Sequence, residues 1–252
     1  MNYLILVRHG QSEWNLQKRF TGWVDVELTP NGKLEAYKAG ELIKKLNIEI
    51  EYFYSSYQKR AIETLNLILN ISGQGVLTFP DGATYEGVRI KNDKVIKAWQ
   101  LNERHYGALT GLNKDEMKKK YGEDKIHEIR RSWDIKPEPL NKDSPYHPLN
   151  IETYNDIPRD NIPNTESLQD TYNRVVPYFE QNIFKNLEKN ISIVAHGNSL
   201  RSICKFLFKL DNKKISKLEI PTGNPLLIKF KNSVVESANY LDKERAKDLL
   251  VF

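Results

Sequence analysis

One pattern occurs twice in this chain: an apolar run with the character of a buried strand, then a histidine, a glycine and a helical stretch. The first copy reads LILVRHG (4–10) and the second ISIVAHG (191–197). Short apolar runs of this kind are typical of strands covered on both faces of a parallel sheet. Open α/β sheets bind ligands at the carboxyl ends of their strands. We therefore expect His9 and His196 to meet in one crevice.

The residues at these junctions suit chemistry on a phosphoryl group. Neutral histidine is a competent nucleophile near pH 7, and arginine forks around phosphate oxygens. Arg8 precedes His9, whose ring we expect to be exposed at the strand end, and Gly10 is expected to let the backbone approach an anion. A further predicted strand, residues 50–54, is followed by a helix with Arg60 in its first turn. Each residue alone is more often structural; their coincidence at three strand–helix junctions favours an anion site.

The remaining periodicity indicates one α/β domain spanning residues 1–252, with a mainly parallel sheet flanked by helices on both faces. Thr29 and Pro30 are typical of a helix start. Helices are predicted over residues 31–46, 58–69, 113–121, 123–132, 167–187 (with a kink at Pro177) and 199–208. Strands are predicted over residues 3–7, 50–54, 94–99 and 191–195, with 225–230 as the last strand, and residues 73–85 are expected to be turn-rich and exposed.

Two segments stand apart from this alternation. Residues 133–164 contain six prolines and no apolar periodicity, and neither flank resembles a complete domain. A loop this long within a compact chain is usually disordered or functional, and we interpret it as a lid. Residues 243–252 form a charged tail, helical over 243–250, that could also close over the pocket.

Composition narrows the partners. The 252 residues carry a formal net charge of +5, without a Lys- or Arg-rich block, so nucleic acid is disfavoured as a partner. No apolar run reaches membrane-spanning length and no signal peptide is evident, so no membrane partner is expected. Cys204 is the only cysteine, which fits a reducing compartment and predicts a cytoplasmic protein. The histidines lack the spacing of metal ligands, so no metal site is expected.

Longer motifs make the resemblance specific. RHGQSEWN, FTGW, LTPNG, RAIET, LNERHYGALTGLNK, RRS, ESLQDT, AHGNSLR and IPTG occur in this order between residues 8 and 223. Together they resemble the cofactor-dependent phosphoglycerate mutases of the histidine phosphatase superfamily. RHG is shared by the whole superfamily, whereas LNERHYGALTGLNK is far more specific. The resemblance implies a sheet with one antiparallel strand and a homodimer or homotetramer.

The resemblance also assigns roles position by position. His9 matches the nucleophile, while Arg8, Arg60 and His196 match the pocket that holds the phosphoryl group. Glu103 matches the general acid/base; its structural alternative is a salt bridge to the neighbouring arginine. The positions that match substrate contacts are Asn15, Thr21, Gly22, Tyr106, Lys114, Arg130, Arg131, Gly197 and Asn198.

The implied activity is the glycolytic and gluconeogenic interconversion of 3-phosphoglycerate and 2-phosphoglycerate through a phosphohistidine. It is primed by 2,3-bisphosphoglycerate and needs no metal. Bisphosphoglycerate synthase, phosphatase or broader histidine phosphatase activity would use the same pocket. A non-catalytic phospho-ligand-binding module is the alternative from another class, but binding alone requires no nucleophile such as His9. The sequence leaves open the oligomeric state, the ratio of these activities and the role of the tail.

Overall fold

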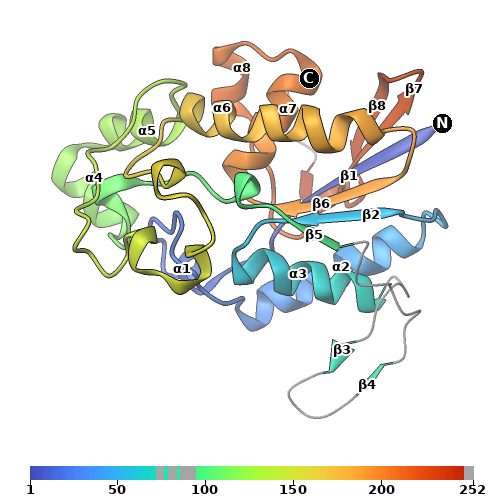
Figure 1. Cartoon of the computed structure of the whole chain (residues 1–252), viewed down its shortest axis with the longest axis horizontal. Coiled ribbons are helices and arrows are strands. Elements are labelled where there is room, and N and C mark those ends of the chain that lie inside the picture. The colour runs from blue at the N-terminus through green and yellow to red at the C-terminus, as the bar shows by residue number, and fades with distance from the viewer. Residues whose placement is uncertain (72–76, 79–83, 86–94, 247–252) are drawn as a thin grey trace.

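A six-stranded sheet forms the centre of the protein (Figure 1), whose computed structural model describes residues 1–71, 77–78, 84–85 and 95–246. In this sheet β5, β2, β6 and β1 run parallel, β7 is antiparallel to β1, and β8 pairs antiparallel with β7. Thus β7 is the reversed strand, and the prediction of a mainly parallel sheet is confirmed. The strands are β1 (Asn2–Arg8), β2 (Tyr52–Ser55), β5 (Val95–Lys97), β6 (Ile191–Ala195), β7 (Leu226–Lys231) and β8 (Val234–Tyr240); β3 (Leu77–Thr78) and β4 (Thr84–Tyr85) form a separate pair.

Helices cover both faces of this sheet, as predicted. Because successive side chains of a strand point to opposite faces, β1 contributes Leu4 and Leu6 to one apolar core and Ile5 and Val7 to the other. The first core packs under α6 (Leu168–Tyr178) and α7 (Gly197–Phe208), and the second under α2 (Pro30–Lys44) and α3 (Lys59–Ile71). Figure 1 shows these pairs above and below the sheet.

The predicted helix starts and stops are mostly confirmed. The Thr29 side chain accepts a hydrogen bond from the Gly32 N–H, so Thr29 caps α2 and Pro30 opens it. The two short helices are α4 (Lys114–Tyr121) and α5 (Glu123–Arg131). Pro177 lies in the last turn of α6, and the chain continues through a π-helical turn (Phe179–Ile183) and a 3-10 turn (Phe184–Asn186).

Two α-helices and three strands were missed, among them the two-residue strands β3 and β4 in the stretch that we expected to be turn-rich. Helices α1 (Glu13–Leu16) and α8 (Asn212–Lys217) are too short to show a period, and β8 follows the strand that we predicted to be the last. That prediction is wrong because β8 lies at the sheet edge and is mostly exposed, so its sequence carries little apolar signal. Its hairpin turn uses Asn232 and Ser233, both with positive φ, rather than a glycine.

The long proline-rich segment contains three 3-10 turns, Pro148–Asn150, Glu152–Tyr154 and Arg159–Asn161. Tyr154 is 1% exposed and packs against Trp23, whose carbonyl accepts its hydroxyl hydrogen bond. The segment is thus anchored beside the loop that follows α1.

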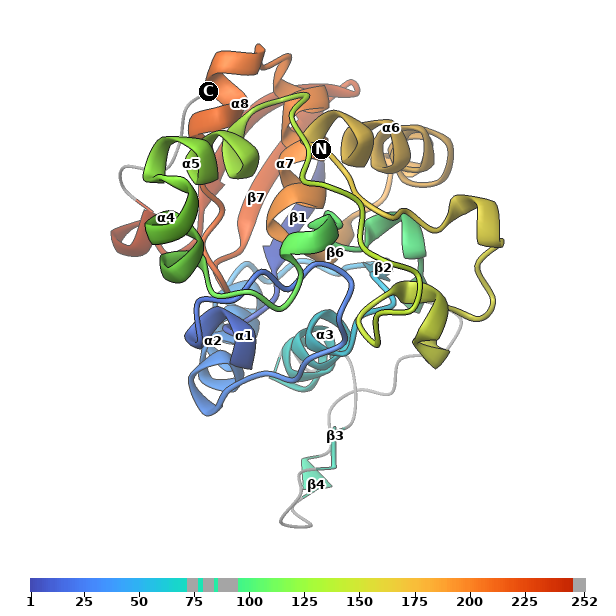
Figure 2. The ribbon, with the colours of Figure 1, turned by 90° about the vertical axis from the view of Figure 1, so that its left-hand side faces the viewer.

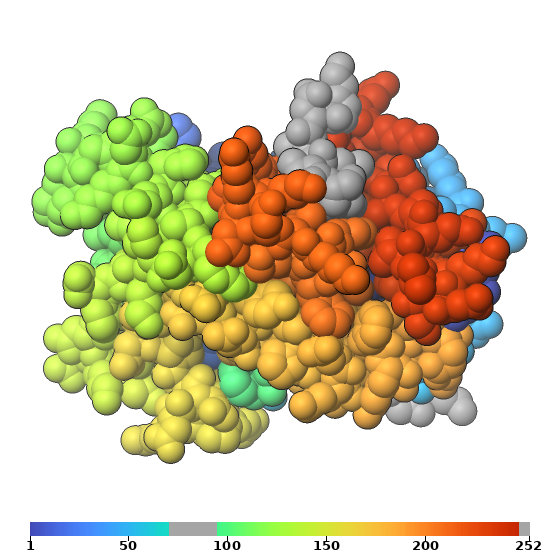
Figure 3. All heavy atoms as spheres, turned by 90° about the horizontal axis from the view of Figure 1, so that it is seen from above, coloured from blue at the N-terminus to red at the C-terminus, as the bar shows by residue number. Residues whose placement is uncertain are grey.

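The predicted tail helix lies mainly outside the described residues, which contain a 3-10 turn at Glu244–Ala246. Most of the 73–85 segment also lies outside them. Seen from above, the orange atoms of the segment that includes α8 lie beside the yellow-green atoms of α5 (Figure 3). In the described part of the chain, none of the helices combines the length and the hydropathy needed to cross a bilayer.

Candidate active site

The carboxyl ends of three parallel strands meet at one edge of the sheet, which faces the viewer in Figure 2. Arg8, the last residue of β1, pairs with Ala195 of β6, and β6 pairs in turn with β2. The backbone N–H of His9 donates to the Ala195 carbonyl, 3.0 Å away, and the rings of His9 and His196 lie 4.9 Å apart between centroids. The predicted convergence of the two histidines is confirmed.

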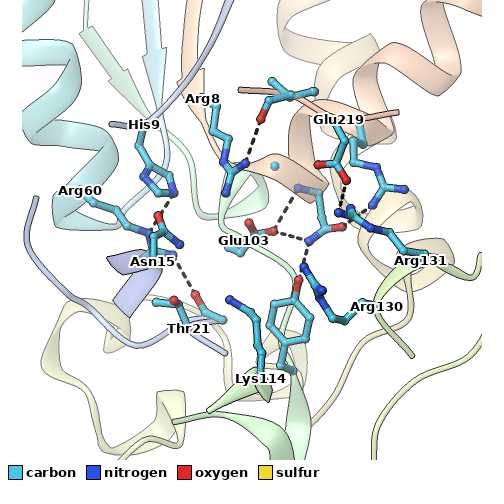
Figure 4. A pocket seen from close by; sticks show the side chains of 16 residues that line it. Arg8, His9, Asn15, Thr21, Arg60, Glu103, Lys114, Arg130, Arg131 and Glu219 are labelled. Atoms are coloured by element: carbon cyan, nitrogen blue, oxygen red, sulfur yellow. Dashed lines mark hydrogen bonds and ion pairs between the residues drawn. The ribbon is translucent and has the colours of Figure 1, made fainter. Parts of the chain in front are cut away.

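A cavity opens at this edge, and thirteen of the fourteen predicted site residues line it (Figure 4). His196 is the exception, since it lies behind His9 and is fully buried. The segment 133–164 contributes no lining residue. The lining comprises Arg8, His9, Asn15, Thr21, Gly22, Arg60, Glu103, Tyr106, Lys114, Arg130, Arg131, Gly197 and Asn198, together with Arg201, Glu219 and Ile220.

His9 is held in one tautomer. Its Nδ1 lies 2.7 Å from the Gly10 carbonyl oxygen, which can only accept, so Nδ1 carries the proton and Nε2 keeps its lone pair. The Arg60 Nε–H points at Nε2 from 3.3 Å. The ring is 2% exposed, so the expectation of an exposed ring is wrong: His196 and Arg60 cover it. Burial, then the charges of Arg60 and Arg8, hold the pKa of His9 well below its usual value.

His196 is neutral for the same reasons. Burial comes first, and the charge of Arg60 adds to it, so the pKa of His196 is also held well below its ordinary value. Its Nε2 lies 2.7 Å from the Ser56 hydroxyl at the end of β2. Two uncharged imidazoles therefore stand next to each other, and the Nε2 of His9 is unprotonated and accepts a hydrogen bond from Arg60.

Arg60 and Arg8 bring positive charge to this nitrogen. The buried Arg60 guanidinium donates to the carbonyls of Val24 (2.9 Å) and Gly22 (2.9 Å), which fixes its orientation. Arg8 donates from Nη1 to the Ile220 carbonyl at 2.9 Å. Its Nε is buried and has no hydrogen-bond partner among the described residues. A buried unpaired donor on a cavity wall is suited to an anionic ligand.

Gly10 is needed for packing, a reason that the sequence did not suggest, while its approach to an anion stays a prediction. A Cβ at Gly10 would lie 2.1 Å from the Gly32 carbonyl oxygen, and a Cβ at Gly32 would lie 2.0 Å from that of Gln11. The first turn of α2 thus lies directly against the loop that carries His9, and neither position has room for a side chain.

Glu103 lies across the cavity and is 8% exposed. Its Oε1 accepts hydrogen bonds from the Arg104 backbone N–H (2.8 Å) and from the backbone and side-chain nitrogens of Asn198 (3.2 and 2.9 Å). The Arg104 guanidinium instead donates to the carbonyls of Glu166 and Ile135, so the salt-bridge alternative is not what the structure contains. With Oε1 occupied, Oε2 faces the cavity next to Gly197.

The outer part of the cavity is strongly cationic. Lys114 donates to the Arg19 carbonyl at 2.7 Å, and burial followed by the charge of Arg130 lowers its pKa to about 8. Burial and then Arg131 lower the pKa of Arg201 to about 10. Crowded, partly desolvated cations of this kind are stabilised by an incoming anion.

Sequence reasoning missed five residues at or behind this site: the lining residues Arg201, Glu219 and Ile220, and the buried pair Arg174 and Glu166. Arg201, Ile220 and Glu166 lie within motifs quoted above, but nothing local distinguished their role. Arg174 donates to both Glu166 carboxylate oxygens and to the Glu103 carbonyl, so the pair lies behind the loop that presents Glu103.

This geometry is typical of a class of protein: an α/β protein whose anion-attracting cavity holds a neutral histidine, fixed arginines and a carboxylate on the opposite wall. The profile of the histidine phosphatase superfamily (branch 1) matches residues 4–81 and 142–241. The chain belongs to this superfamily.

The chain is far more similar in sequence to individual relatives than to the proteins of known structure that share its fold. The chain is 63% identical to the "2,3-bisphosphoglycerate-dependent phosphoglycerate mutase" of Pelagibacter ubique (strain HTCC1062), over all of both chains. It is 46% identical to the protein of the same name from Maricaulis maris (strain MCS10), over 99% of this chain and 98% of that one. The structure of a mycobacterial glucosyl-3-phosphoglycerate phosphatase with VO3 matches with a TM-score of 0.66 and 19% identity, over 95% and 97% of the chains. Bacillus stearothermophilus YhfR matches with a TM-score of 0.64 and 19% identity, over 94% and 95%. These structures share the fold.

Proposed function

We propose that the chain is a phosphoglycerate mutase that interconverts 3-phosphoglycerate and 2-phosphoglycerate and depends on 2,3-bisphosphoglycerate. The observation that carries this proposal is the 63% identity, over the full length of both chains, to the relative of that name. The cavity supports it, because an inner site beside His9 and an outer cationic site lie on either side of Glu103.

In this proposal the His9 Nε2 accepts a phosphoryl group, which later passes to a substrate hydroxyl. The nitrogen–phosphorus bond breaks as the new phosphorus–oxygen bond forms, and Glu103 Oε2 takes the hydroxyl proton. Arg8 and Arg60 hold the three equatorial oxygens, over which the charge of such a transition state spreads. His196 packs against the reacting ring and fixes its orientation.

The outer residues bind and orient. Lys114, Arg130 and Arg131 would hold the glycerate carboxylate and the distal phosphate, so that binding energy aligns the hydroxyl for attack. The unpaired Arg8 Nε and the crowded outer cations fit a ligand with two phosphates. When bound, 2,3-bisphosphoglycerate supplies the priming phosphoryl group. The other contacts assigned to this cavity are Asn15, Thr21, Gly22, Tyr106, Gly197 and Asn198.

Further assignments accompany this proposal. The chain is one domain over residues 1–252, acts in the cytoplasm in glycolysis and gluconeogenesis, and forms a homodimer or homotetramer. The described residues contain no group of three or more His, Cys, Asp or Glu side chains placed to hold a metal, and the proposed mechanism uses none.

An enolase-coupled assay tests the proposal. Purified protein should convert 3-phosphoglycerate only after priming with 2,3-bisphosphoglycerate, and phosphate release should be much slower. His9→Asn should abolish turnover and the phosphoryl label, whereas His127→Asn, which changes an exposed histidine, should leave both intact. Release of phosphate without formation of 2-phosphoglycerate would instead identify a phosphatase. Binding of phosphoglycerate without turnover or a labelled histidine would identify a binding module.

A further inference from the structure

Glu219 places a negative charge on the wall of a cavity that is otherwise suited to bind anions. It follows α8 and lines the outer wall, close to Arg131 (Figure 4). The only other carboxylate in the wall is that of Glu103, which has a role in the proposed chemistry. The remaining charged lining residues are all cations: Arg8, Arg60, Lys114, Arg130, Arg131 and Arg201.

The Glu219 carboxylate forms an ion pair with Arg131, from Oε1 to Nη2. In the described part of the chain it has no other hydrogen-bond partner. Its side chain is 43% exposed, whereas that of Arg131 is 20% exposed. The carboxylate therefore meets the arginine from the solvent side, where an entering ligand would also meet it.

The backbone at this position is fixed although the side chain is not. The Glu219 carbonyl accepts a hydrogen bond from the Tyr240 hydroxyl (3.3 Å), and the next carbonyl, of Ile220, accepts one from Arg8 (2.9 Å). A half-exposed side chain on a fixed backbone can change rotamer without moving the loop. Glu219 can thus leave Arg131 at little structural cost.

We infer that Glu219 is a counter-ion for Arg131 that exchanges with the outer anionic group of the phosphoglycerate and so sets its affinity. This inference rests on the proposed function. In the free protein Glu219 balances one cation of a crowded cluster. When the ligand binds, the ligand's carboxylate or phosphate replaces Glu219 as the ion-pair partner of Arg131. When the ligand dissociates, Glu219 pairs with Arg131 again.

The sign of the effect follows from this arrangement. A carboxylate that merely oriented Arg131 would lie behind the guanidinium, away from the cavity, and its loss would weaken binding. Glu219 lines the cavity itself, so its neutral isostere should strengthen binding by removing a competitor. Ion pairs this exposed are weak, which limits the gain to about two- to fivefold.

Glu219→Gln, introduced into the inactive His9→Asn protein, tests the inference by calorimetric titration with 3-phosphoglycerate. We expect Kd to fall about two- to fivefold, and KM in the active protein to fall without a rise in kcat. The matched control is Glu123→Gln, which removes the exposed partner of Lys118 away from the cavity and should leave Kd unchanged. In an Arg131→Gln background, Glu219→Gln should have no effect.

Three results would overturn the inference: an unchanged Kd, a raised Kd, or a tightening that persists without Arg131. The last would indicate a general field effect rather than exchange at one arginine. If the His9→Asn parent itself did not bind 3-phosphoglycerate, the proposed function would fail together with the inference. Binding by the parent combined with no response to Glu219→Gln would refute this inference alone.

Discussion

Replacing Arg174 with methionine should destabilise the protein and displace Glu103. Arg174 projects from α6, and its side chain is 8% exposed. It pairs with Glu166 through Nε–Oε1 (2.8 Å) and Nη2–Oε2 (2.9 Å), and it donates to the carbonyls of Gln100 (2.8 Å), Asn102 (3.2 Å) and Glu103 (3.3 Å). The loop that presents Glu103 is therefore hydrogen-bonded to α6 through this guanidinium.

The size of the effect follows from burial. Methionine keeps the apolar stem but leaves Glu166, whose side chain is 4% exposed, with the His105 N–H as a donor. Removing one partner of a buried ion pair typically costs about 3–5 kcal/mol. At about 2–4 °C per kcal/mol for a domain of this size, Tm should fall by about 6–20 °C. A shift of about 1 Å in the loop would lower kcat by about 10²-fold.

Thermal unfolding followed by circular dichroism, together with the coupled assay well below Tm, measures both effects. Lys136→Met is the matched control, because Lys136 forms an exposed pair with Asp170 and its loss should cost less than about 1 kcal/mol. Glu166→Gln added to Arg174→Met should recover stability by removing the unpaired charge, but not kcat. The reasoning is wrong if Arg174→Met and Lys136→Met shift Tm equally. If Tm falls while kcat is kept, Arg174 stabilises the fold without positioning Glu103.

Three further changes are expected. Because the pKa of Lys114 is about 8, its charge is lost above that pH. KM for 3-phosphoglycerate should therefore rise from pH 7 to 9 in the native protein and rise less in Lys114→Arg. Identical pH profiles of KM in the two proteins would contradict this. Burial lowers the pKa of His105 to about 3, below its value near 6.5 in the unfolded chain. Between these two pH values the unfolded chain binds more protons at His105 than the folded protein does. The free energy of unfolding therefore decreases as pH falls below 6.5. At pH 5 this costs about 2 kcal/mol, and His105→Gln should reduce the difference between urea midpoints at pH 7 and pH 5; an unaltered difference would refute the assignment. Deleting the chain after Tyr240 removes Arg245, which pairs with Glu35 at 3.3 Å, and should lower mutase activity more than phosphatase activity; an unchanged ratio would mean that the tail does not exclude water from the pocket.

Most of the strands and helices could be predicted from local hydrophobic patterns in the sequence. Apolar runs and helical periodicity indicated β1, β6, α2 and α7. A strand covered on both faces, or a helix with one buried face, needs apolar residues at its buried positions, and their spacing is visible in the sequence. The same rule explains the failure at β8: an edge strand buries little, so its sequence carries little signal.

The convergence of His9 and His196 was also within reach of the sequence. Parallel strands present their carboxyl ends together, so two histidines that each follow a buried strand must lie at one edge once those strands pair. Glu103 and the outer cations were predicted only from the motifs that resemble the phosphoglycerate mutase family. Nothing in their sequence positions indicated that they would lie close to the two histidines.

Only the tertiary structure decided the environment of these groups. The burial of His9, the choice of its Nε2 as the free nitrogen and the packing role of Gly10 all depend on which residues face them from other elements. The same holds for Arg174 behind the loop that presents Glu103 and for Glu219 against Arg131, residues separated by 71 and 88 positions from the groups they contact. Sequence determines what each element can bury. Which charges then share a low-dielectric space is determined when the elements pack, and this sets the protonation, orientation and affinity of the site.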